Sequence, residues 1–351
     1  MRRSILVFLL VTTLIVTFLL HSVSTLLSLL LEDASADAIH RSELPAPNST
    51  LLESRPQLIP KIIHQTYINE SIPEHWKPAQ QSCIDLHSDY EYILWTDAKA
   101  LDFITQEYPW FLTTFVGYEY PIQRADAIRY FVLAHYGGVY IDLDDGCQRR
   151  LDPLLSYTAW VRRTVPTGIS NDVMAAIPQH PFFLRVIESL QGANRKWVLP
   201  YITIMASTGP LFLSVMWKKW MGEHSNLDPD EWVGRVRVLM PDEYNRHAWS
   251  FFQTYKGSSW HGKDAKLIFW MGKNWILLTA GGFMLAGLLG FIVWWGYNRL
   301  VVIGARKRTG GSPRSSVFRF SFSSPNPLWR RWGGGKNTNK QVYELLEQHD
   351  A

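Results

Sequence analysis

Two carboxylates stand two residues apart in the segment Gly137-Gly-Val-Tyr-Ile-Asp-Leu-Asp144 of this 351-residue chain. The apolar run before them predicts a strand over 139–143. Residues two apart in a strand project to the same side, so we expect Asp142 and Asp144 on one face. Two adjacent carboxylates repel each other unless a divalent cation holds both in their ionised form. Oxygen ligands suit Mg²⁺ or Mn²⁺, either of which can bind the diphosphate of a nucleotide-sugar.

A second group of charged residues precedes this acid pair. Arg124, Asp126 and Arg129 fall within two turns of a helix that is predicted to begin at Pro121 and to stop at Gly137-Gly138. Asp126 and Arg129 are three residues apart and therefore share a helix face. Charged side chains beside so apolar a strand predict a polar ligand such as a sugar diphosphate. On spacing alone, a helix-surface ion pair and a solvated strand end remain the alternatives.

Strands and helices alternate along the chain around these residues. Strands are predicted over 60–67 and 90–95, a helix capped by Thr96 or Asp97 runs to Tyr108, and further helices cover 182–190 and 211–220. This alternation predicts an α/β domain with a central, mostly parallel sheet. Open sheets of this kind bind ligands at the carboxyl ends of their strands, which is where the acid pair lies.

Two apolar runs, 4–31 and 275–297, predict two transmembrane helices. Residues 298–351 carry ten basic and three acidic side chains, and Arg2 and Arg3 precede the first run. Positive flanks stay cytoplasmic, so both termini are expected in the cytoplasm and the middle of the chain in the lumen. A signal peptide cleaved near Ala34-Ser35-Ala36 is the alternative for the first run.

These features divide the chain into five parts. Residues 1–31 form a cytoplasmic stub and signal anchor, 32–57 a proline-containing stem, 58–274 a lumenal catalytic domain, 275–297 a transmembrane helix, and 298–351 a basic, disordered cytoplasmic tail. The net charge of +4 comes from the two ends, so the middle is acidic, which excludes a nucleic-acid-binding surface. Cys83 and Cys147 are the two cysteines of the chain, and whether they pair stays open.

Five segments, taken in order, resemble a known enzyme family. They are Pro60-Lys-Ile-Ile-His-Gln-Thr66, Tyr92-Ile-Leu-Trp-Thr-Asp97, Arg124-Ala-Asp-Ala-Ile-Arg-Tyr130, Gly137 to Asp144, and Ser258-Ser-Trp-His261. This order is similar to that of the family 32 glycosyltransferases with a DXD sugar-binding region. The resemblance covers about residues 58–265 and implies a GT-A-like nucleotide-sugar transferase domain. Asp-Leu-Asp-Asp-Gly-Cys at 142–147, the second span and the basic tail resemble the fungal subgroup that makes mannosyl-inositol-phosphorylceramide.

The resemblance implies a role for each polar residue of these motifs. Asp144 is expected to bind the metal directly, Asp142 to contact the ribose or the metal through water, and His261 to be the remaining metal ligand. Asp142, Asp144 and Arg129 are the expected catalytic residues. The expected donor-binding residues are Asp126, Arg129, Asp142, Asn171, Asp172 and Trp260.

The function implied by the resemblance is transfer of mannose from GDP-mannose to inositol-phosphorylceramide with retention of configuration. The family implies Mn²⁺ or Mg²⁺ as cofactor, a Golgi membrane location, and a separate membrane-embedded regulatory subunit. Two alternatives remain: a Golgi mannosyltransferase that acts on protein-linked glycans, and a metal-dependent carbohydrate-binding protein without turnover.

Overall fold

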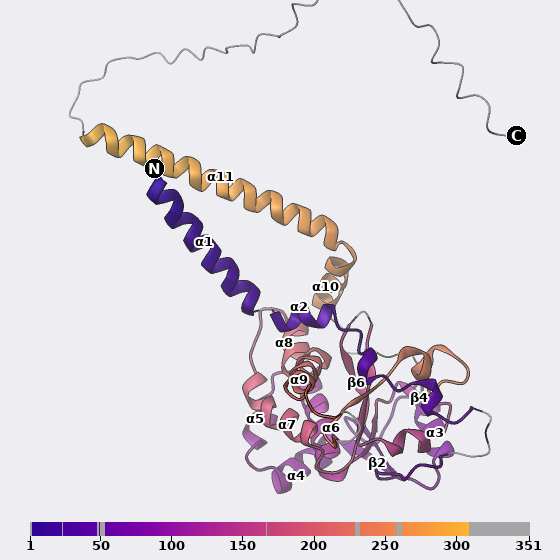
Figure 1. The fold of residues 1–351 in the computed structure, drawn as a ribbon. Coiled ribbons are helices and arrows are strands. Elements are labelled where there is room, and N and C mark those ends of the chain that lie inside the picture. Colours follow the sequence, from indigo (N-terminus) through magenta and orange to yellow (C-terminus); the bar gives the residue numbers. More distant parts are fainter. Residues whose placement is uncertain are drawn as a thin grey trace, which may run out of the picture. The chain divides into compact units, whose positions relative to one another are not determined.

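A computed structural model describes residues 2–22, 24–47, 49, 53–165, 167–228, 232–255, 257 and 262–308. The chain divides into two units, 1–275 and 276–351. The first unit contains the α/β domain, and the second contains most of one long helix (Figure 1).

A six-stranded sheet forms the centre of the first unit, in the order β2-β1-β3-β6-β5-β7. Strands β1 and β2, β1 and β3, and β5 and β7 pair in parallel, whereas β6 runs antiparallel to both β3 and β5. Five of the six strands therefore share one direction. The predicted α/β class is confirmed, with a mixed sheet. The strands are β1 (Ile62–Tyr67), β2 (Glu91–Thr96), β3 (Gly138–Ile141), β5 (Ala159–Arg163), β6 (Ile169–Ala176) and β7 (Arg237–Leu239).

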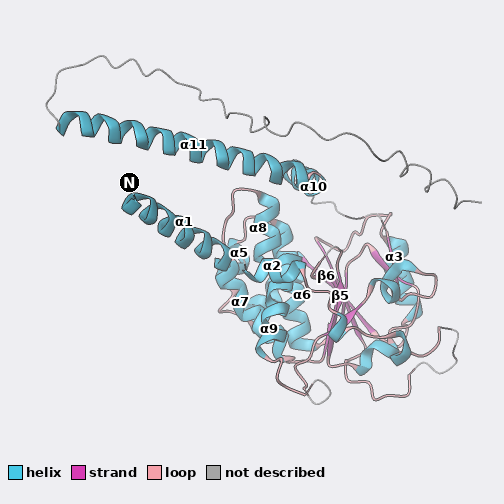
Figure 2. Cartoon of the chain, turned by 45° about the horizontal axis from the view of Figure 1, so that its top comes forward, coloured by secondary structure: helices cyan, strands magenta, loops and turns pink. Residues whose placement is uncertain are grey.

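Helices cover one face of this sheet, and α3 and a smaller sheet lie on the other (Figure 2). Strand β3 shows the division, because Tyr140 belongs to the core on the side of the large helices and Val139 and Ile141 to the opposite core. The helices of the domain are α3 (Lys77–Leu86), α4 (Asp97–Glu107), α5 (Leu112–Gly117), α6 (Pro121–Tyr136), α7 (Pro181–Ala193), α8 (Pro200–Ser207), α9 (Pro210–Glu223) and α10 (Lys263–Lys273).

Helix α6 begins at Pro121 and ends before Gly137, as the sequence predicts. Gly137 and Gly138 both have positive φ angles, 66° and 93°. A Cβ on Gly138 would come within 2.7 Å of the Ile62 carbonyl oxygen, so only glycine allows β3 to lie this close to β1. The two glycines therefore set both the end of the helix and the start of the strand that leads to the acid pair.

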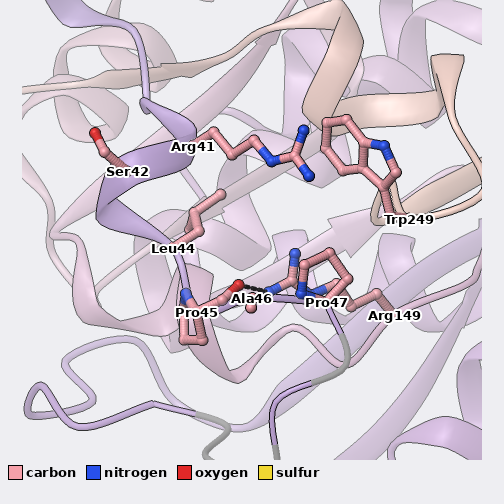
Figure 3. Close-up of a pocket in the computed structure, with 8 residues that line it drawn as sticks. All are labelled: Arg41, Ser42, Leu44, Pro45, Ala46, Pro47, Arg149 and Trp249. Carbon is pink, nitrogen blue, oxygen red and sulfur yellow. Dashed lines mark hydrogen bonds between the residues drawn. The ribbon is translucent and has the colours of Figure 1, made fainter.

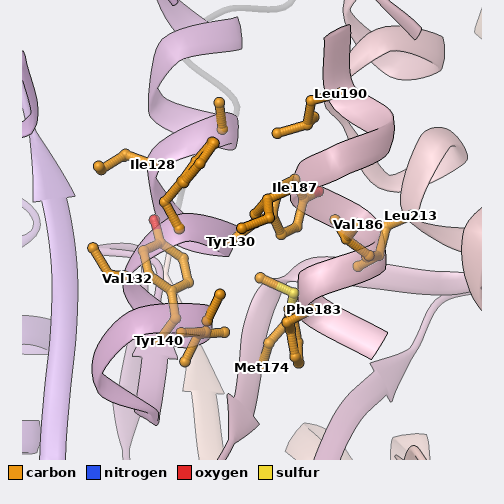
Figure 4. Packing of buried hydrophobic residues seen from close by; sticks show 14 of the residues in the cluster. Ile128, Tyr130, Val132, Tyr140, Met174, Phe183, Val186, Ile187, Leu190 and Leu213 are labelled. Atoms are coloured by element: carbon orange, nitrogen blue, oxygen red, sulfur yellow. The ribbon is translucent and has the colours of Figure 1, made fainter. Parts of the chain in front are cut away.

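Helix α6 lies between the sheet and the outer helices, and most of its length is buried. Apolar side chains on one side of it pack against α7 and α9, as Figure 4 shows for Tyr130, Phe183 and Leu213. A helix buried on all sides has no solvent-facing stripe for charged residues. Charged side chains in its middle must therefore find partners inside the protein.

A second, two-stranded sheet pairs β4 (Asp145–Cys147) with β8 (Phe252–Thr254). A disulfide joins Cys147 in β4 to Cys83 in α3, with the two Cα atoms 4.7 Å apart. The two cysteines of the chain are therefore paired, which their number alone does not determine. It attaches the small sheet to the helix beside it.

The segment before β1 lies partly against the domain. Ala38 forms a parallel bridge with Val238 of β7, and Ile39 donates a hydrogen bond to the Val238 carbonyl oxygen at 2.9 Å. Arg237 binds the Glu43 carboxylate at 2.6 Å. The first part of the predicted stem is therefore held to the sheet edge, and the boundaries of the stem itself stay a prediction.

Apolar helices occur near both ends of the described chain. In the second unit, α11 (Trp275–Arg308) contains a 26-residue apolar stretch, Trp275–Leu300, long enough to cross a membrane. At the other end, α1 (Arg2–Ser22) and α2 (Ser24–Leu30) reach that length only as a pair bent by 57°. Within the described residues, one helix is therefore long and apolar enough by itself to cross a membrane. The second predicted span is not confirmed. Residues 309–351 of the predicted tail lie outside the described residues.

Candidate active site

The acid pair lies in a turn that follows β3. The strand ends at Ile141, and the Asp145 amide donates a hydrogen bond to the Asp142 carbonyl oxygen at 3.0 Å. The prediction that the strand continues to residue 143 is therefore wrong, and strand alternation does not bring Asp142 and Asp144 together. Both residues lie instead in this turn, near enough for the charge of Asp144 to raise the pKa of Asp142. Strand β4 follows the turn and belongs to the small sheet rather than the large one.

Asp142 is held by two neighbours. The Tyr140 hydroxyl donates to its carboxylate at 2.6 Å, and Arg129 Nη1 lies 3.3 Å from the same oxygen. Burial raises the pKa of Asp142 to about 7, and the charges of Asp144 and Asp172 add to the rise, while Arg129 opposes it. The side chain still exposes 28% of its surface, so the carboxylate remains open to a ligand.

Asp126 and Arg129 form an ion pair inside α6, with Arg129 Nη2 3.0 Å from Asp126 Oδ1. The other Asp126 oxygen accepts from the Thr208 hydroxyl at 3.1 Å. Arg129 also donates to the Asn171 carbonyl oxygen at 2.7 Å. Both side chains are more than nine-tenths buried, so they support the acid turn from behind. Their predicted contact with a donor sugar stays a prediction.

Asn171 and Asp172 lie on β6, antiparallel to β3 and next to the acid turn. Asn171 donates its side-chain amide to Asp126 at 3.0 Å and is buried. The Asp172 carbonyl oxygen accepts from the Asp142 amide at 2.8 Å. Asn171 therefore lies behind the acid turn and Asp172 at its edge, while their predicted contact with the donor stays a prediction.

Arg162 is a member of the site that sequence reasoning missed. It lies on β5, and its Nη2 is 2.6 Å from the Asp172 carboxylate. Burial alone would lower the pKa of this guanidinium, but Asp172 and other nearby acidic groups raise it above its ordinary value. The sequence does contain a signal for this role, because Arg162 follows the apolar run Ala159-Trp160-Val161. A charged side chain on a strand that is buried on both faces requires an oppositely charged partner.

Asp145 is the third acid of the turn region and was given no role from the sequence. It is buried, and its carboxylate accepts from the Thr254 hydroxyl of β8 at 3.0 Å. Burial and the charge of Asp172 raise the pKa of Asp145 well above its ordinary value. Asp145 therefore joins the two strands of the small sheet.

Gly257 brings a further segment against the acid turn. A Cβ on Gly257 would overlap with the Asp144 carboxylate, so the backbone there lies in contact with this side chain. The Tyr255 amide also donates to the Asp144 carbonyl oxygen at 2.6 Å. Trp260 and His261, the predicted donor-binding residue and metal ligand, lie outside the described residues, so both roles stay predictions.

The acids of the turn have the chemistry of a site for a hard divalent cation. Burial raises the pKa of Asp144, as does the charge of Asp172, so the carboxylates lie near enough to repel one another. A divalent cation would relieve this repulsion, and carboxylate oxygens are the ligands that Mg²⁺ and Mn²⁺ prefer. Within the described ranges, no group of three or more His, Cys, Asp or Glu side chains is arranged to hold a metal. The predicted third ligand, His261, falls outside those ranges.

Comparisons with known proteins agree with the site. Residues 73–160, which contain Asp126, Arg129, Asp142 and Asp144, match the family described as glycosyltransferase sugar-binding region containing DXD motif. The chain is 50% identical over 302 residues to mannosyl phosphorylinositol ceramide synthase CSH1 of Saccharomyces cerevisiae, covering 84% of this chain and 77% of that protein. It is 49% identical over 261 residues to inositol phosphoceramide mannosyltransferase 2 of Schizosaccharomyces pombe, covering 73% and 75%. Among solved structures, PaToxG glycosyltransferase matches with a TM-score of 0.34 and 18% identity over 48% of this chain and 72% of that chain.

Proposed function

This chain belongs to the glycosyltransferases whose sugar-binding region contains a DXD motif, and we propose that it transfers mannose from GDP-mannose to the head group of inositol phosphoceramide. The observation that carries the proposal is the Asp142–Asp144 turn, supported by Arg129, in a chain half identical to a mannosyl phosphorylinositol ceramide synthase over 302 residues. We further propose that the α/β domain is GT-A-like and that the donor binds at the carboxyl end of β3.

The donor would bind at the acid turn together with Mn²⁺ or Mg²⁺. Asp144 would hold the cation directly, and Asp142 would hold it through water or bind the ribose. When bound, the cation would neutralise negative charge on the departing diphosphate. Arg129 and Tyr140 fix the orientation of the Asp142 carboxylate, and Asp126 fixes Arg129. A site whose charged groups are already oriented needs little reorganisation during the reaction.

Transfer with retention of configuration requires the acceptor hydroxyl to approach from the leaving-group side. Asp172 is the carboxylate beside the turn that could assist, but Arg162 binds it at 2.6 Å and it also accepts from the Val173 amide at 2.8 Å. We therefore assign the base to a phosphate oxygen of the departing diphosphate. Asp172 would orient the donor sugar instead.

A membrane location fits the acceptor, because a ceramide cannot leave the bilayer during the reaction. Helix α11 is long and apolar enough to cross a membrane. We propose that it forms one span and that α1 and α2 form a second anchor, with the catalytic domain in the Golgi lumen and both termini in the cytoplasm. The separate regulatory subunit would bind within the membrane. Gly282 and Gly290 of α11 have open space where a Cβ would stand, which would allow a neighbouring helix to approach closely.

The test uses membranes that contain the full-length protein. They are incubated with GDP-mannose, inositol phosphoceramide and Mn²⁺, and the lipid is analysed by mass spectrometry for the gain of one hexose. Asp144→Asn removes one charge at the turn and should abolish the gain. Asp242→Asn, at an acid that is 56% exposed, is the matched control and should leave the gain unchanged.

Three results would overturn the proposal. A hexose gain only with UDP-galactose would refute the donor. Mannose found on protein-linked glycans but not on the lipid would refute the acceptor. Full activity of Asp144→Asn would refute the site.

A further inference from the structure

A cavity of about 230 Å³ lies beside the small sheet, and two arginines line it (Figure 3). Arg41 comes from the short helical turn Arg41–Glu43 before β1, and Arg149 stands two residues after β4. The other lining residues are Ser42, Leu44, Pro45, Ala46, Pro47 and Trp249. Segments far apart in the sequence thus bring two guanidinium groups to one opening, which we call the Arg41–Arg149 pocket.

Both guanidinium groups of this pocket are held in place. The Arg41 Cζ atom lies 4.1 Å from the centroid of the Trp249 ring, and the Arg149 Cζ atom lies 4.6 Å from that of Phe251. Arg149 also donates to the Pro45 carbonyl oxygen at 2.5 Å. Stacking leaves the N–H edges of a guanidinium available for further hydrogen bonds. The pocket therefore presents donors from an exposed Arg41 and a half-buried Arg149, each placed against an aromatic ring.

Among the residues that the structure describes, no acid pairs with either of these two arginines. The residues that line the pocket include no Asp or Glu, and among the described residues neither Arg41 nor Arg149 has an ion pair. Neighbouring arginines differ: Arg150 binds Asp89 at 2.8 Å, and Arg237 binds Glu43. Burial lowers the pKa of Arg149, and the charge of Arg41 lowers it further. Two uncompensated positive charges at one cavity favour an anionic ligand.

We propose that the Arg41–Arg149 pocket binds the phosphate group of a polyol phosphate ester. The fork of N–H groups on each arginine matches the oxygens of a phosphate, which can accept from both side chains at once. Leu44, Pro45 and Pro47 supply an apolar wall, which suits the C–H face of a ring such as inositol. The cavity is large enough for a ring as well as a phosphate.

The position of the pocket connects it to the acid turn. Arg149 is five residues from Asp144, and five residues of extended chain span at most about 18 Å. The ligand could therefore be the phosphoinositol head group of the lipid acceptor, an identification that rests on the proposed function. A soluble phosphate ester would make the same contacts. The anion site itself depends on neither choice.

The binding test uses the purified full-length protein in detergent, with inositol 1-phosphate as the probe and inorganic phosphate and free inositol as comparisons. Calorimetric titration of the wild type should show saturable binding of inositol 1-phosphate and none of inositol. Arg41→Gln should weaken this binding roughly tenfold or more, because it removes charged hydrogen bonds to the phosphate. Arg246→Gln is the matched control, since Arg246 is 57% exposed and already paired with Asp242.

Arg149→Gln is the second variant, with its melting temperature measured in parallel because Arg149 also binds the Pro45 carbonyl oxygen. Arg41→Lys retains a charge but loses the fork and should bind with intermediate affinity. Equal affinity of the wild type and Arg41→Gln, or no binding of inositol 1-phosphate at millimolar concentration, would overturn the proposal.

Steady-state kinetics distinguishes the two candidate ligands, the lipid head group and a soluble phosphate ester. If the ligand is the lipid head group, Arg41→Gln raises the KM for inositol phosphoceramide in vesicles and leaves the KM for GDP-mannose unchanged. If the ligand is a soluble phosphate ester, both KM values stay unchanged while calorimetric binding is lost. Asp144→Asn should keep the calorimetric binding although it abolishes transfer, so a failure of the proposed function is distinguishable from a failure of this site.

Discussion

The disulfide between Cys83 and Cys147 offers the sharpest test of how the acid turn is supported. Cys147 ends β4, and β4 begins directly after Asp144. Both cysteines are buried. Replacing both with serine removes the covalent link between α3 and the small sheet without changing the charge of the protein.

The size of the effect follows from the length of the loop that the bond closes. The two cysteines are 64 residues apart in the sequence. Closing a loop of that length removes chain entropy from the unfolded state worth about 4 kcal/mol at 25 °C. For a domain of this size, a loss of about 4 kcal/mol lowers the melting temperature by roughly 10 °C.

The assay is thermal unfolding of the detergent-solubilised protein, with and without a phosphine reductant. We expect the Cys83→Ser/Cys147→Ser variant to melt roughly 10 °C below the untreated wild type. Reductant should lower the melting temperature of the wild type and leave the variant unchanged. At temperatures well below melting, transfer activity should persist, because backbone hydrogen bonds at Asp142 and Asp144 also hold the turn.

Thiol labelling under denaturing conditions first establishes whether the wild-type bond is intact. If the bond is intact and both proteins nevertheless melt at the same temperature, the loop-entropy reasoning is refuted. If the thiols of the wild type react fully, the bond itself is refuted.

Three further perturbations test the site and the sheet. Gly257→Ala adds a Cβ that overlaps with the Asp144 carboxylate, so transfer should fall at least tenfold with little change in melting temperature; full activity would contradict the contact. Arg162→Gln leaves Asp172 without its partner and should destabilise the domain by about 3 kcal/mol in urea unfolding, with Arg162→Lys recovering part of the loss; an unchanged midpoint would show that the pair is not needed. Burial lowers the pKa of His64 from 6.5 to about 4, so the unfolded chain takes up the proton first. The folded state should therefore lose up to about 3 kcal/mol as pH falls from 6.5 to 4, and none of this contribution should be lost above pH 6.5. His64→Gln should reduce this loss in urea unfolding at pH 4.5 relative to pH 7.5, and an equal loss in both proteins would contradict the assignment.

Residues close together in the sequence predict where helices α4 and α6 begin and where α6 ends. Pro121 and Gly137 predict both ends of α6, because proline suits a first helical turn and glycine accepts a positive φ angle. Thr96 is confirmed as the cap of α4, with its hydroxyl oxygen accepting from the Lys99 amide at 3.3 Å. These signals need only the few residues that surround them.

His64 shows where a motif does not reveal the role of its members. It lies in the Pro60–Thr66 segment that helps to identify the family, yet its ring is fully buried. Nε2 donates to the Gly137 carbonyl oxygen at 2.8 Å, and Nδ1 accepts from the Trp95 indole at 3.1 Å. These two bonds require the neutral ring and join β1, β2 and the end of α6.

The sequence by itself determined the family, the acid pair and an apolar helix near the end of the described chain, because each depends on residue types that lie close together along the chain. Tertiary structure decided the rest. It placed Arg162 against Asp172, joined Cys83 to Cys147, and buried Asp126 and Arg129 behind the turn. Those contacts join residues on different strands and helices, or depend on which face of a helix is buried. Such relations follow from how the elements pack together, and no local spacing contains them.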